Sequence, residues 1–215
     1  IASKSPLTGG YGDGNSGSWA AVEIRKAGYD ALVIEGKAST PVILHIKDKS
    51  WEFLDAKDLW GKSSFEVEDQ LRKKYSKLAG IVSIGPAGEN LVRFATVVSQ
   101  KGRAGGRPGM GAVMGSKNLK AIVVEGTQPI PLAYPDEMKR LAVDGYKELL
   151  TKPLYSFWKR QGTMSTVEWC QENSCLPTFN YKQGVFDKAE GISGFTMEKM
   201  KVSNRGCPQC NMTCG

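Results

Sequence analysis

Residues 94–124 read FATVVSQKGRAGGRPGMGAVMGSKNLKAIVV. The apolar run from Phe94 to Ser99 predicts a strand, and the run from Ala121 to Val124 predicts a second strand that is short and buried. Between them, a glycine-rich loop enters a predicted helix near Ala112 to Asn118. Because more short strands than helices surround this stretch, we predict an α+β domain built on a mixed β-sheet.

The sequence before this stretch predicts further strands and two helices. A turn-rich segment, 1–18, precedes a short predicted helix from Trp19 to Lys26 that ends at Gly28. Ser63 and Glu66 have capping-box spacing, which predicts a helix from about Ser64 to Tyr75. The remaining predicted strands occupy residues 31–34, 42–46, 51–54 and 81–84.

The pattern changes near Pro131. Pro135 suits the first turn of a helix, and Ser165 with Glu168 forms a second capping-box pattern. We therefore predict two domains, a β-rich domain over 1–131 and the start of a mainly helical domain over 132–215. The apolar and small residues that recur at helical spacing are Met138, Leu141, Ala142, Gly145, Tyr146, Leu149 and Leu150.

The composition is that of an ordinary globular protein, with 40% hydrophobic and 24% charged residues. The net charge of +7 favours anionic partners, although a solvated basic surface is the default interpretation. No run approaches about 18 apolar residues and the N-terminus lacks an apolar signal region, so we predict no membrane contact and a cytoplasmic location. The chain begins without Met and stops one residue after a cysteine, which indicates a fragment of a longer protein.

All five cysteines lie in the last quarter of the chain, which favours metal or cluster ligation over a disulfide scaffold. Cys207, Cys210 and Cys214 follow the spacing C-x2-C-x3-C and supply three thiolates for a [4Fe–4S] cluster. A structural zinc site is the alternative, and either site needs a fourth ligand. Cys170 and Cys175 are candidates for it, although buried free cysteine is the commoner state. The only histidine, His45, is far away in a predicted strand.

The glycine-rich loop is also basic, since five basic residues and no acidic residue lie between Gln100 and Lys120. Glycines let backbone N–H groups approach an anion, and arginine binds phosphate through two hydrogen bonds, so an anion site is one interpretation. A solvated surface loop is the other. The spacing of Gly109, Gly111 and Gly115 matches neither a dinucleotide fingerprint nor a P-loop. The basic residues are Lys101, Arg103, Arg107, Lys117 and Lys120.

Six stretches, taken together and in order, resemble the aldehyde:ferredoxin oxidoreductase family of tungstopterin enzymes. The resemblance spans the whole chain. The stretches are Ser5–Gly9, Gly12–Gly17, Ala27–Lys37, Gly85–Asn90, Gly109–Ala121 and Arg205–Gly215.

The resemblance implies a platform sheet beneath a tungsten or molybdenum ion held by two pterins, whose phosphates are bridged by Mg²⁺. It assigns pterin contacts to Asn15, Ser16 and Gly17, and to Arg103, Ala104 and Gly105. The backbone carbonyls of Asn15 and Ala104 would ligate the Mg²⁺, a hard cation that prefers oxygen. Cys207, Cys210 and Cys214 would match three of the four cluster ligands. The fourth cysteine, the acid/base residues and a third domain would lie beyond Gly215, so no catalytic residue is assigned and the fragment is expected to be inactive alone.

The function expected from this resemblance is oxidation of an aldehyde to a carboxylic acid. Electrons would pass through the pterin and the cluster to ferredoxin or an electron-transfer subunit, and a homo-oligomer is compatible with it. A family relative that reduces an aromatic thioester ring is an alternative. A basic zinc-binding module that grips nucleic acid is another, but no aromatic residue interleaves with the basic stretch. A nucleotide-binding enzyme is disfavoured by the glycine spacing, so we expect no nucleic-acid partner.

Overall fold

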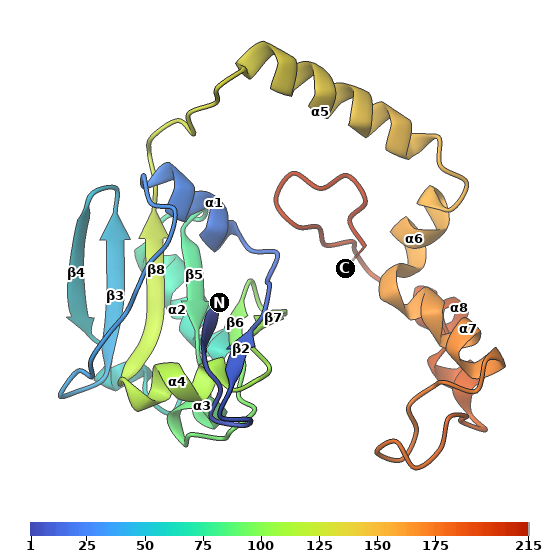
Figure 1. Ribbon diagram of the computed structural model, residues 1–215, viewed down its shortest axis with the longest axis horizontal. Coiled ribbons are helices and arrows are strands. Elements are labelled where there is room, and N and C mark those ends of the chain that lie inside the picture. The colour runs from blue at the N-terminus through green and yellow to red at the C-terminus, as the bar shows by residue number, and fades with distance from the viewer. Residues whose placement is uncertain (215) are drawn as a thin grey trace. The chain divides into compact units, whose positions relative to one another are not determined.

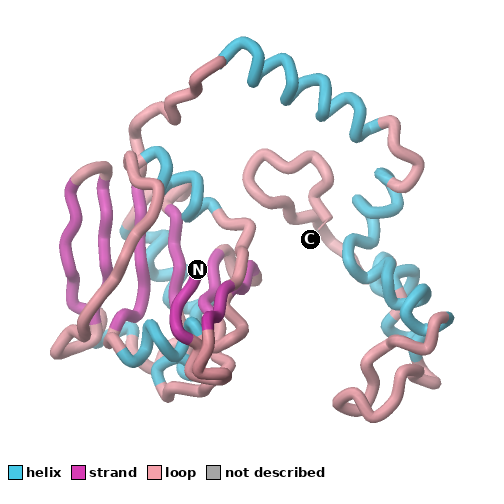
Figure 2. The backbone as a smooth tube through the Cα atoms, in the orientation of Figure 1, coloured by secondary structure: helices cyan, strands magenta, loops and turns pink. Residues whose placement is uncertain are grey.

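The computed structural model describes residues 1–214, so Gly215 lies outside the described residues. The chain divides into two compact units, Ile1–Pro131 and Leu132–Gly215 (Figure 1). Unit 1 is a mixed sheet with helices, and unit 2 is helical (Figure 2). The predicted α+β fold is therefore confirmed.

The six-stranded sheet of unit 1 has the order β4-β3-β8-β5-β6-β7. The pair β3–β8 is parallel and every other neighbouring pair is antiparallel. A separate antiparallel pair joins β1 (Ala2–Lys4) to β2 (Tyr11–Asp13). The strands of the large sheet are β3 (Val42–Lys47), β4 (Ser50–Asp55), β5 (Gly80–Ser83), β6 (Val97–Ser99), β7 (Arg103–Gly105) and β8 (Leu119–Glu125).

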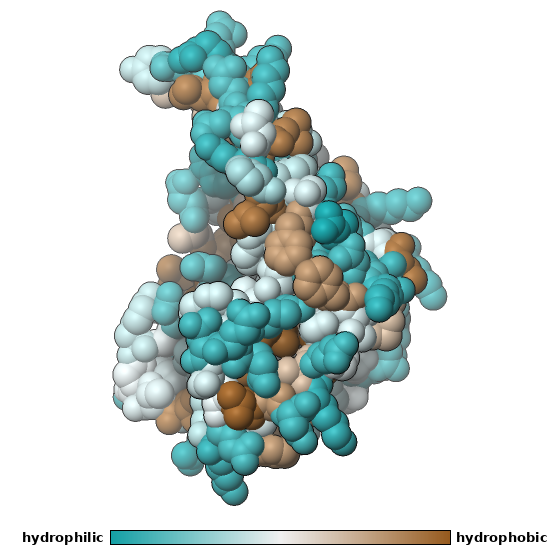
Figure 3. All heavy atoms as spheres, turned by 90° about the vertical axis from the view of Figure 1, so that its right-hand side faces the viewer, coloured by the Kyte–Doolittle hydropathy of each residue, from teal (hydrophilic) through white to brown (hydrophobic). Residues whose placement is uncertain are grey.

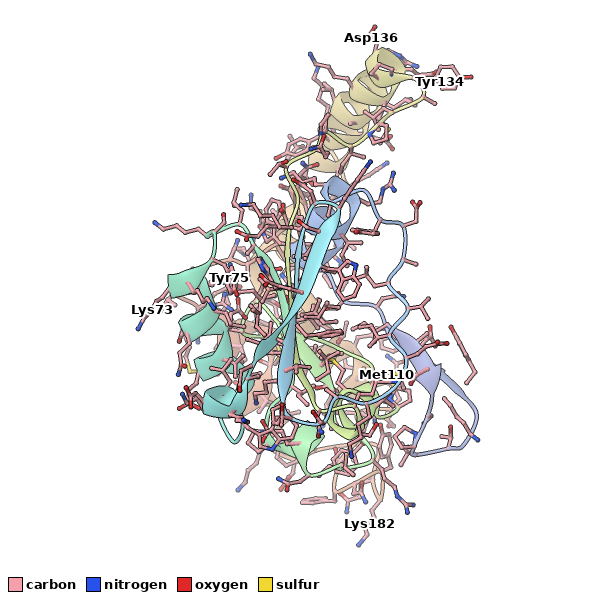
Figure 4. All side chains as sticks on the ribbon, turned by 90° about the vertical axis from the view of Figure 1, so that its left-hand side faces the viewer. Lys73, Tyr75, Met110, Tyr134, Asp136 and Lys182 are labelled. Atoms are coloured by element: carbon pink, nitrogen blue, oxygen red, sulfur yellow. The ribbon has the colours of Figure 1, made fainter. Side chains whose placement is uncertain are left out.

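Apolar residues cover both faces of the large sheet, because neighbouring residues of β3 and β8 point to opposite sides. One face packs against α1 (Trp19–Lys26), α4 (Met110–Ser116) and the loop 28–41, around a cluster that includes Leu44 and Val124. The other face packs against α2 (Ser64–Lys74), around a cluster that includes Ile43 and Val123. In Figure 4, Tyr75 lies at the end of α2 on the side of the sheet, whereas Lys73 points away from it.

Most predicted elements of unit 1 are present. The helix Trp19–Lys26 is confirmed residue for residue, and Ser63 with Glu66 forms the predicted capping box at the start of α2. The strand at Phe94–Ser99 is shorter than predicted and begins at Val97, because the Ala95 carbonyl accepts a hydrogen bond from the Gly111 amide (2.8 Å). Several elements were not predicted. The turn-rich segment 1–18 contains the short strands β1 and β2, and the glycine-rich loop contains β7. The 3-10 turn Lys57–Leu59 and the one-turn helix α3 (Pro86–Glu89) were also not predicted.

The strand predicted at 31–34 is wrong. These residues form an extended loop that crosses the sheet face over β3 and β8 (Figure 2), with Leu32 and Ile34 packed against the core and Val33 85% exposed. Alternating burial gives this loop the sequence pattern of a strand, although no neighbouring strand pairs with its backbone in the described residues.

The helix predicted at 112–118 runs instead from Met110 to Ser116. It stops before Asn118 because that residue has a left-handed backbone (φ 56°), and its side-chain amide donates to the Ala38 carbonyl (2.7 Å). Glycines set its packing. A Cβ on Gly115 would overlap the Gly88 carbonyl of α3, and one on Gly111 would lie 2.5 Å from the Thr96 carbonyl.

A buried ion pair links α3 to β8. Lys120 is fully buried, and its ammonium donates to the carboxylate of Glu89 and to the Lys62 carbonyl (2.8 Å). The second carboxylate oxygen of Glu89 accepts from the Gly61 amide (2.8 Å). Burial lowers the pKa of Lys120, while the hydrogen bond that its ammonium donates to Glu89 opposes that shift. These contacts join β8, α3 and the loop that precedes α2.

Unit 2 begins with the predicted helix, α5 (Pro135–Leu150), whose proline occupies the first turn. None of the residues of α5 is buried, and hydrophobic side chains lie at the surface between hydrophilic ones on the face drawn in Figure 3. Among the described residues, no helix has the length and hydropathy needed to cross a membrane. The other elements are α6 (Tyr155–Gln161), α7 (Thr166–Glu172), α8 (Gly194–Glu198) and the 3-10 turns Gly162–Ser165 and Ala189–Ile192.

The second predicted capping box does not form, although α7 begins where the pattern placed it. The Ser165 hydroxyl donates to the Gly162 carbonyl (2.8 Å) instead of capping the helix. The carboxylate of Glu168 accepts from the Gly194 amide (3.0 Å) at the start of α8. Ser165 is therefore used in a local bond to the preceding 3-10 turn, and Glu168 in a tertiary contact that the local pattern does not reveal.

Candidate cofactor-binding site

The first candidate segment, 14–17, connects β2 to α1. Two hydrogen bonds hold its start, because the Gly14 amide donates to the Ile1 carbonyl (2.9 Å) and the Ile1 amino group donates to the Gly14 carbonyl (3.0 Å). Asn15 is exposed, whereas Ser16 and Gly17 are half-buried. Ser18 then caps α1, since its hydroxyl accepts from the Ala20 amide (3.0 Å). The segment is thus fixed at both ends.

The second candidate segment is β7, which pairs with β6 across a tight turn. Ala104 lies opposite Val98, and Arg103 lies opposite Ser99. The turn needs a left-handed backbone at Gln100 and Lys101, which both have φ of 51°. Arg103 is half-buried and Ala104 is exposed.

These two segments lie against one another. A Cβ on Gly105 would be 3.3 Å from the Ser16 Cβ and 3.5 Å from the Asn15 carbonyl oxygen. A Cβ on Gly14 would overlap the Gly106 amide nitrogen and lie 3.0 Å from its Cα. Only glycine, which has no Cβ, lets the two backbones come this close, so both turns need a glycine at the point of contact. The structure therefore brings together the residues predicted on the two turns.

The Met110 side chain packs against Gly12 and Gly106, next to the two turns. It is 2% exposed, and its Sδ accepts a hydrogen bond from the Ser3 hydroxyl (3.0 Å). A Cβ on Gly12 would be 3.2 Å from the Met110 Cε, and one on Gly106 would overlap its side chain. Figure 4 shows this side chain at the start of α4. The methionine therefore occupies the volume that a larger residue at either glycine would need.

A buried pair of serines joins the two turns. The hydroxyls of Ser18 and Ser99 are 2.6 Å apart, and that of Ser99 also donates to the Ile81 carbonyl (2.5 Å). Next to this pair, the Trp19 amide donates to the side-chain carbonyl of Gln100 (3.1 Å). These bonds join residues 81 positions apart in the chain. The bonded pair, Ser18 with Ser99, is called the serine bridge below.

Buried Glu68 of α2 holds the second turn from its other side. One carboxylate oxygen accepts from the Lys101 amide (2.9 Å), and the other accepts two bonds from the guanidinium of Arg72, at 2.8 and 2.7 Å. The Lys101 ammonium in turn pairs with Asp69 at 2.5 Å. This turn is thus positioned from two elements, α1 and α2.

A cavity of about 290 Å³ opens between the two turns. This volume is close to the lower end of the range of small-molecule sites, about 300–1,000 Å³. The Ser16 hydroxyl in its wall is buried and has no hydrogen-bond partner among the described residues. A buried polar group without a partner is one that a bound polar ligand would satisfy. With the glycine cradle and Arg103, the site fits the polar end of a pterin. Its wall includes Asn15, Ser16, Ser18, Ser99 and Arg103.

Replacing Ser99 with alanine is expected to loosen the two turns while the sheet stays folded. The change removes two buried hydrogen bonds, so we expect unfolding to become easier by about 1–3 kcal/mol. We also expect the full-length protein to retain less of the pterin predicted at this site, by more than this stability loss explains. Urea unfolding and the pterin content per subunit measure the two effects. Ser50→Ala is the matched control, because the Ser50 hydroxyl is exposed and bonds only to Lys47 (2.8 Å).

Most of the basic residues of the glycine-rich stretch do not line this cavity. Lys101 and Lys120 form ion pairs, and the Lys117 ammonium donates to the Gly36 carbonyl (3.1 Å). Gly109, Gly111 and Gly115 are used for close packing around α4. Of the residues in this stretch, Arg103 and the turn next to it therefore remain as the candidates for binding an anion at the cavity.

The predicted cluster cysteines lie on a loop that folds back on itself. The Cys210 amide donates to the Cys207 carbonyl (3.0 Å), and a Cβ on Gly206 would be 3.0 Å from the Thr213 methyl group. The Tyr155 hydroxyl holds the loop through the Asn211 carbonyl (2.9 Å). Cys207, Cys210 and Cys214 are exposed free thiols. Within residues 1–214, no group of three or more His, Cys, Asp or Glu side chains is arranged to hold a metal.

The thiols of this loop have the donor chemistry that an iron–sulfur cluster needs, although the structure does not gather them. On the same loop, the Thr213 hydroxyl is buried and has no hydrogen-bond partner within residues 1–214. His45 is no cluster ligand here, since its ring nitrogens lie 3.2 Å from Glu52 and 3.1 Å from Glu125. The positions of the three cysteines as ligands therefore remain a prediction.

Sequence reasoning missed the residues that hold the turns in place, namely Ser18, Ser99, Gln100 and Glu68. Ser18 directly precedes the predicted helix, so its capping role was a readable signal. The other three act across long sequence distances, and nothing local marks them.

Two family models match the chain. The model described as "Aldehyde ferredoxin oxidoreductase, N-terminal domain" matches residues 1–126. The model described as "Aldehyde ferredoxin oxidoreductase, domains 2 & 3" matches residues 140–215.

Similar proteins are larger than this chain. The tungsten-containing aldehyde ferredoxin oxidoreductases of Pyrococcus furiosus and Thermococcus kodakarensis are 43% and 41% identical over 100% of the chain, which spans 36% of their length. A WOR-like subunit of an aliphatic sulfonate oxidoreductase from Pyrococcus furiosus is 35% identical over 97% of the chain and is covered to 36%. The solved active-site complex BamBC of benzoyl coenzyme A reductase, with 1,5-dienoyl-CoA, matches with a TM-score of 0.79 and 29% identity. That match covers 99% of this chain and 35% of the other.

Proposed function

Because the chain belongs to the aldehyde ferredoxin oxidoreductase family, we propose that it is part of a tungsten–pterin enzyme that oxidises an aldehyde to a carboxylic acid. The reaction consumes one water and releases two electrons and two protons. A [4Fe–4S] cluster would carry these electrons toward ferredoxin or an electron-transfer subunit. The aldehyde ferredoxin oxidoreductases at 41–43% identity support this substrate class.

The observation that carries the proposal is the meeting of segments 14–17 and 103–105 at a cavity with an unpartnered serine hydroxyl. Arg103 is the cationic residue in the cavity wall, so we assign it to the pterin phosphates. Ser16 would bond to a polar pterin atom, and Gly17 and Gly105 would leave room for it. The backbone carbonyls of Asn15 and Ala104 would hold a Mg²⁺, because this cation prefers oxygen ligands.

When bound, the metal and its pterins supply the two-electron redox chemistry. The chain's contribution is to position them. The serine bridge and Glu68 fix the two turns before the ligand arrives, so little ordering is needed on binding. The apolar cavity of about 500 Å³ beside the turns, lined by Val82, Val97 and Ile122, keeps that side of the site poor in water.

We further propose that Cys207, Cys210 and Cys214 ligate one [4Fe–4S] cluster, with the fourth ligand outside this chain. The loop supports this because backbone at Gln209 and Thr213 is left-handed (φ 59° and 45°), which turns the chain sharply between the thiols. Thiolates at short spacing in such turns are the usual cluster ligands.

A second candidate function is reduction of an aromatic thioester ring, because the solved benzoyl coenzyme A reductase complex shares the fold over 99% of the chain. We rank it below aldehyde oxidation, since that match is 29% identical against 41–43% for the aldehyde enzymes. A nucleic-acid-binding zinc module has lost its support, because the two family models account for residues 1–126 and 140–215.

Metal analysis of the full-length protein, purified without oxygen, tests the proposal. We expect tungsten or molybdenum together with about four irons per subunit, and aldehyde-dependent reduction of ferredoxin. Zinc as the sole metal would contradict it. Reduction of an aromatic acyl thioester without aldehyde oxidation would select the second candidate.

A further inference from the structure

The end of α7 brings two cysteines into contact. The Cys175 amide donates to the Cys170 carbonyl (2.9 Å), and the Ser174 amide donates to the Gln171 carbonyl (3.2 Å). Between them Ser174 has a left-handed backbone, with φ of 54°. This pair of bonds is the Schellman termination of a helix, in which the side chains at the two outer positions meet. Those positions are occupied here by Cys170 and Cys175.

The two thiols are neighbours with different surroundings. They lie close enough to influence one another's ionisation, and Cys170 is half-buried whereas Cys175 is exposed. Burial, followed by the hydrogen bond with Cys175, raises the pKa of the Cys170 thiol. The exposed thiol is therefore the one that a reagent in solution reaches first.

We infer that Cys170 and Cys175 form a dithiol site that a low-molecular-weight disulfide oxidises reversibly to an intramolecular disulfide. The Cys175 sulfur, as its thiolate, attacks one sulfur of the reagent, and the reagent's S–S bond breaks to release one thiolate. The Cys170 sulfur then attacks the Cys175 sulfur of the mixed disulfide and displaces the second reagent thiolate. The two cysteine protons end on the two released thiols, so the chain loses two hydrogens and the reagent gains them.

The helix end favours the second step over persistence of the mixed disulfide. Its backbone bonds already hold the two residues together, so closing the ring costs little additional ordering. Next to the pair, the Leu176 amide donates to the Gly184 carbonyl (2.8 Å), and Thr178 bridges Gln183. A disulfide would therefore fasten the end of α7 to the base of the loop 176–184.

The inference does not rest on the proposed function, and peptide mapping tests it separately. Trypsin cleaves after Arg160 and Lys182, so residues 161–182 form one peptide that holds this pair without the other cysteines. After the full-length protein is treated with oxidised glutathione, we expect the mass of this peptide to be lower by two hydrogens. Dithiothreitol should restore the mass. A peptide that keeps both thiols free, or one cross-linked to the peptide that begins at Gly206, would overturn the inference.

Two single variants test the order of attack. In Cys170→Ser we expect a stable glutathione adduct on Cys175, because the resolving thiol is absent. In Cys175→Ser we expect Cys170 to stay largely unmodified, because it is half-buried. Equal modification of both variants would contradict the assigned roles. A different outcome is that glutathione reacts with neither cysteine while the cluster is bound and with both after iron is removed. That outcome would identify the two cysteines as cluster ligands and overturn the dithiol site.

Discussion

Replacing Gly14 with alanine is expected to break the contact between the two turns and abolish pterin binding. The new Cβ would overlap the Gly106 amide nitrogen, which belongs to backbone and has no flexible end to move aside. Overpacking of this kind costs about 1–3 kcal/mol when the chain relaxes around it. Here the relaxation separates the segments that carry Asn15 and Ala104, so the loss of pterin should exceed the loss of stability. Pterin and tungsten per subunit measure the first, and urea unfolding the second.

Gly10→Ala is the matched control for this change. Gly10 lies in the same glycine-rich segment, but a Cβ there would meet only the Thr8 hydroxyl at 3.8 Å. Its backbone is not left-handed, so alanine causes no strain. We expect wild-type pterin content and unfolding in this variant. Equal pterin content in Gly14→Ala and Gly10→Ala would show that contact between the turns is not needed for binding.

Replacing Lys120 with methionine is expected to destabilise unit 1 by about 3–5 kcal/mol, since it leaves a buried carboxylate without its partner. Glu89 is held in place by the Gly61 amide as well, so its charge has no simple route to solvent. The midpoint of urea unfolding should fall accordingly, with the slope unchanged.

The double variant Lys120→Met with Glu89→Gln separates a lost charge partner from lost packing. Removing the carboxylate's charge should recover a large part of the stability, because glutamine still accepts the Gly61 hydrogen bond. If the double variant is as unstable as Lys120→Met alone, packing around the lysine stem explains the loss and the ion pair does not. Lys57→Met is the exposed control, as the Lys57–Asp55 pair is solvated and should contribute little.

The fold was predictable where local chemistry determines it. Ser63 and Glu66 satisfy the backbone at the start of α2 within one turn, so the pattern and the outcome agree. Residues 31–34 show the limit. Their alternating burial comes from lying across a sheet, and pairing with a neighbouring strand is a tertiary property that alternation alone does not report.

The candidate site was predictable only in part. Resemblance to a family identified the two turns, but their physical contact depends on Gly14 and Gly105, whose neighbours lie about ninety positions away in the sequence. Glu68 is a further example. Its spacing to Arg72 is that of an ordinary helical ion pair, and nothing nearby indicates that its other oxygen holds the Lys101 amide.

The serine bridge has a consequence for biogenesis. Since 81 positions separate its partners, forming this bond closes a long loop, and we expect it to form late in folding. The bonds that join the two turns are also few compared with those of the sheet. We expect the turns to part locally at a lower cost than global unfolding, which gives a large ligand a way in during maturation.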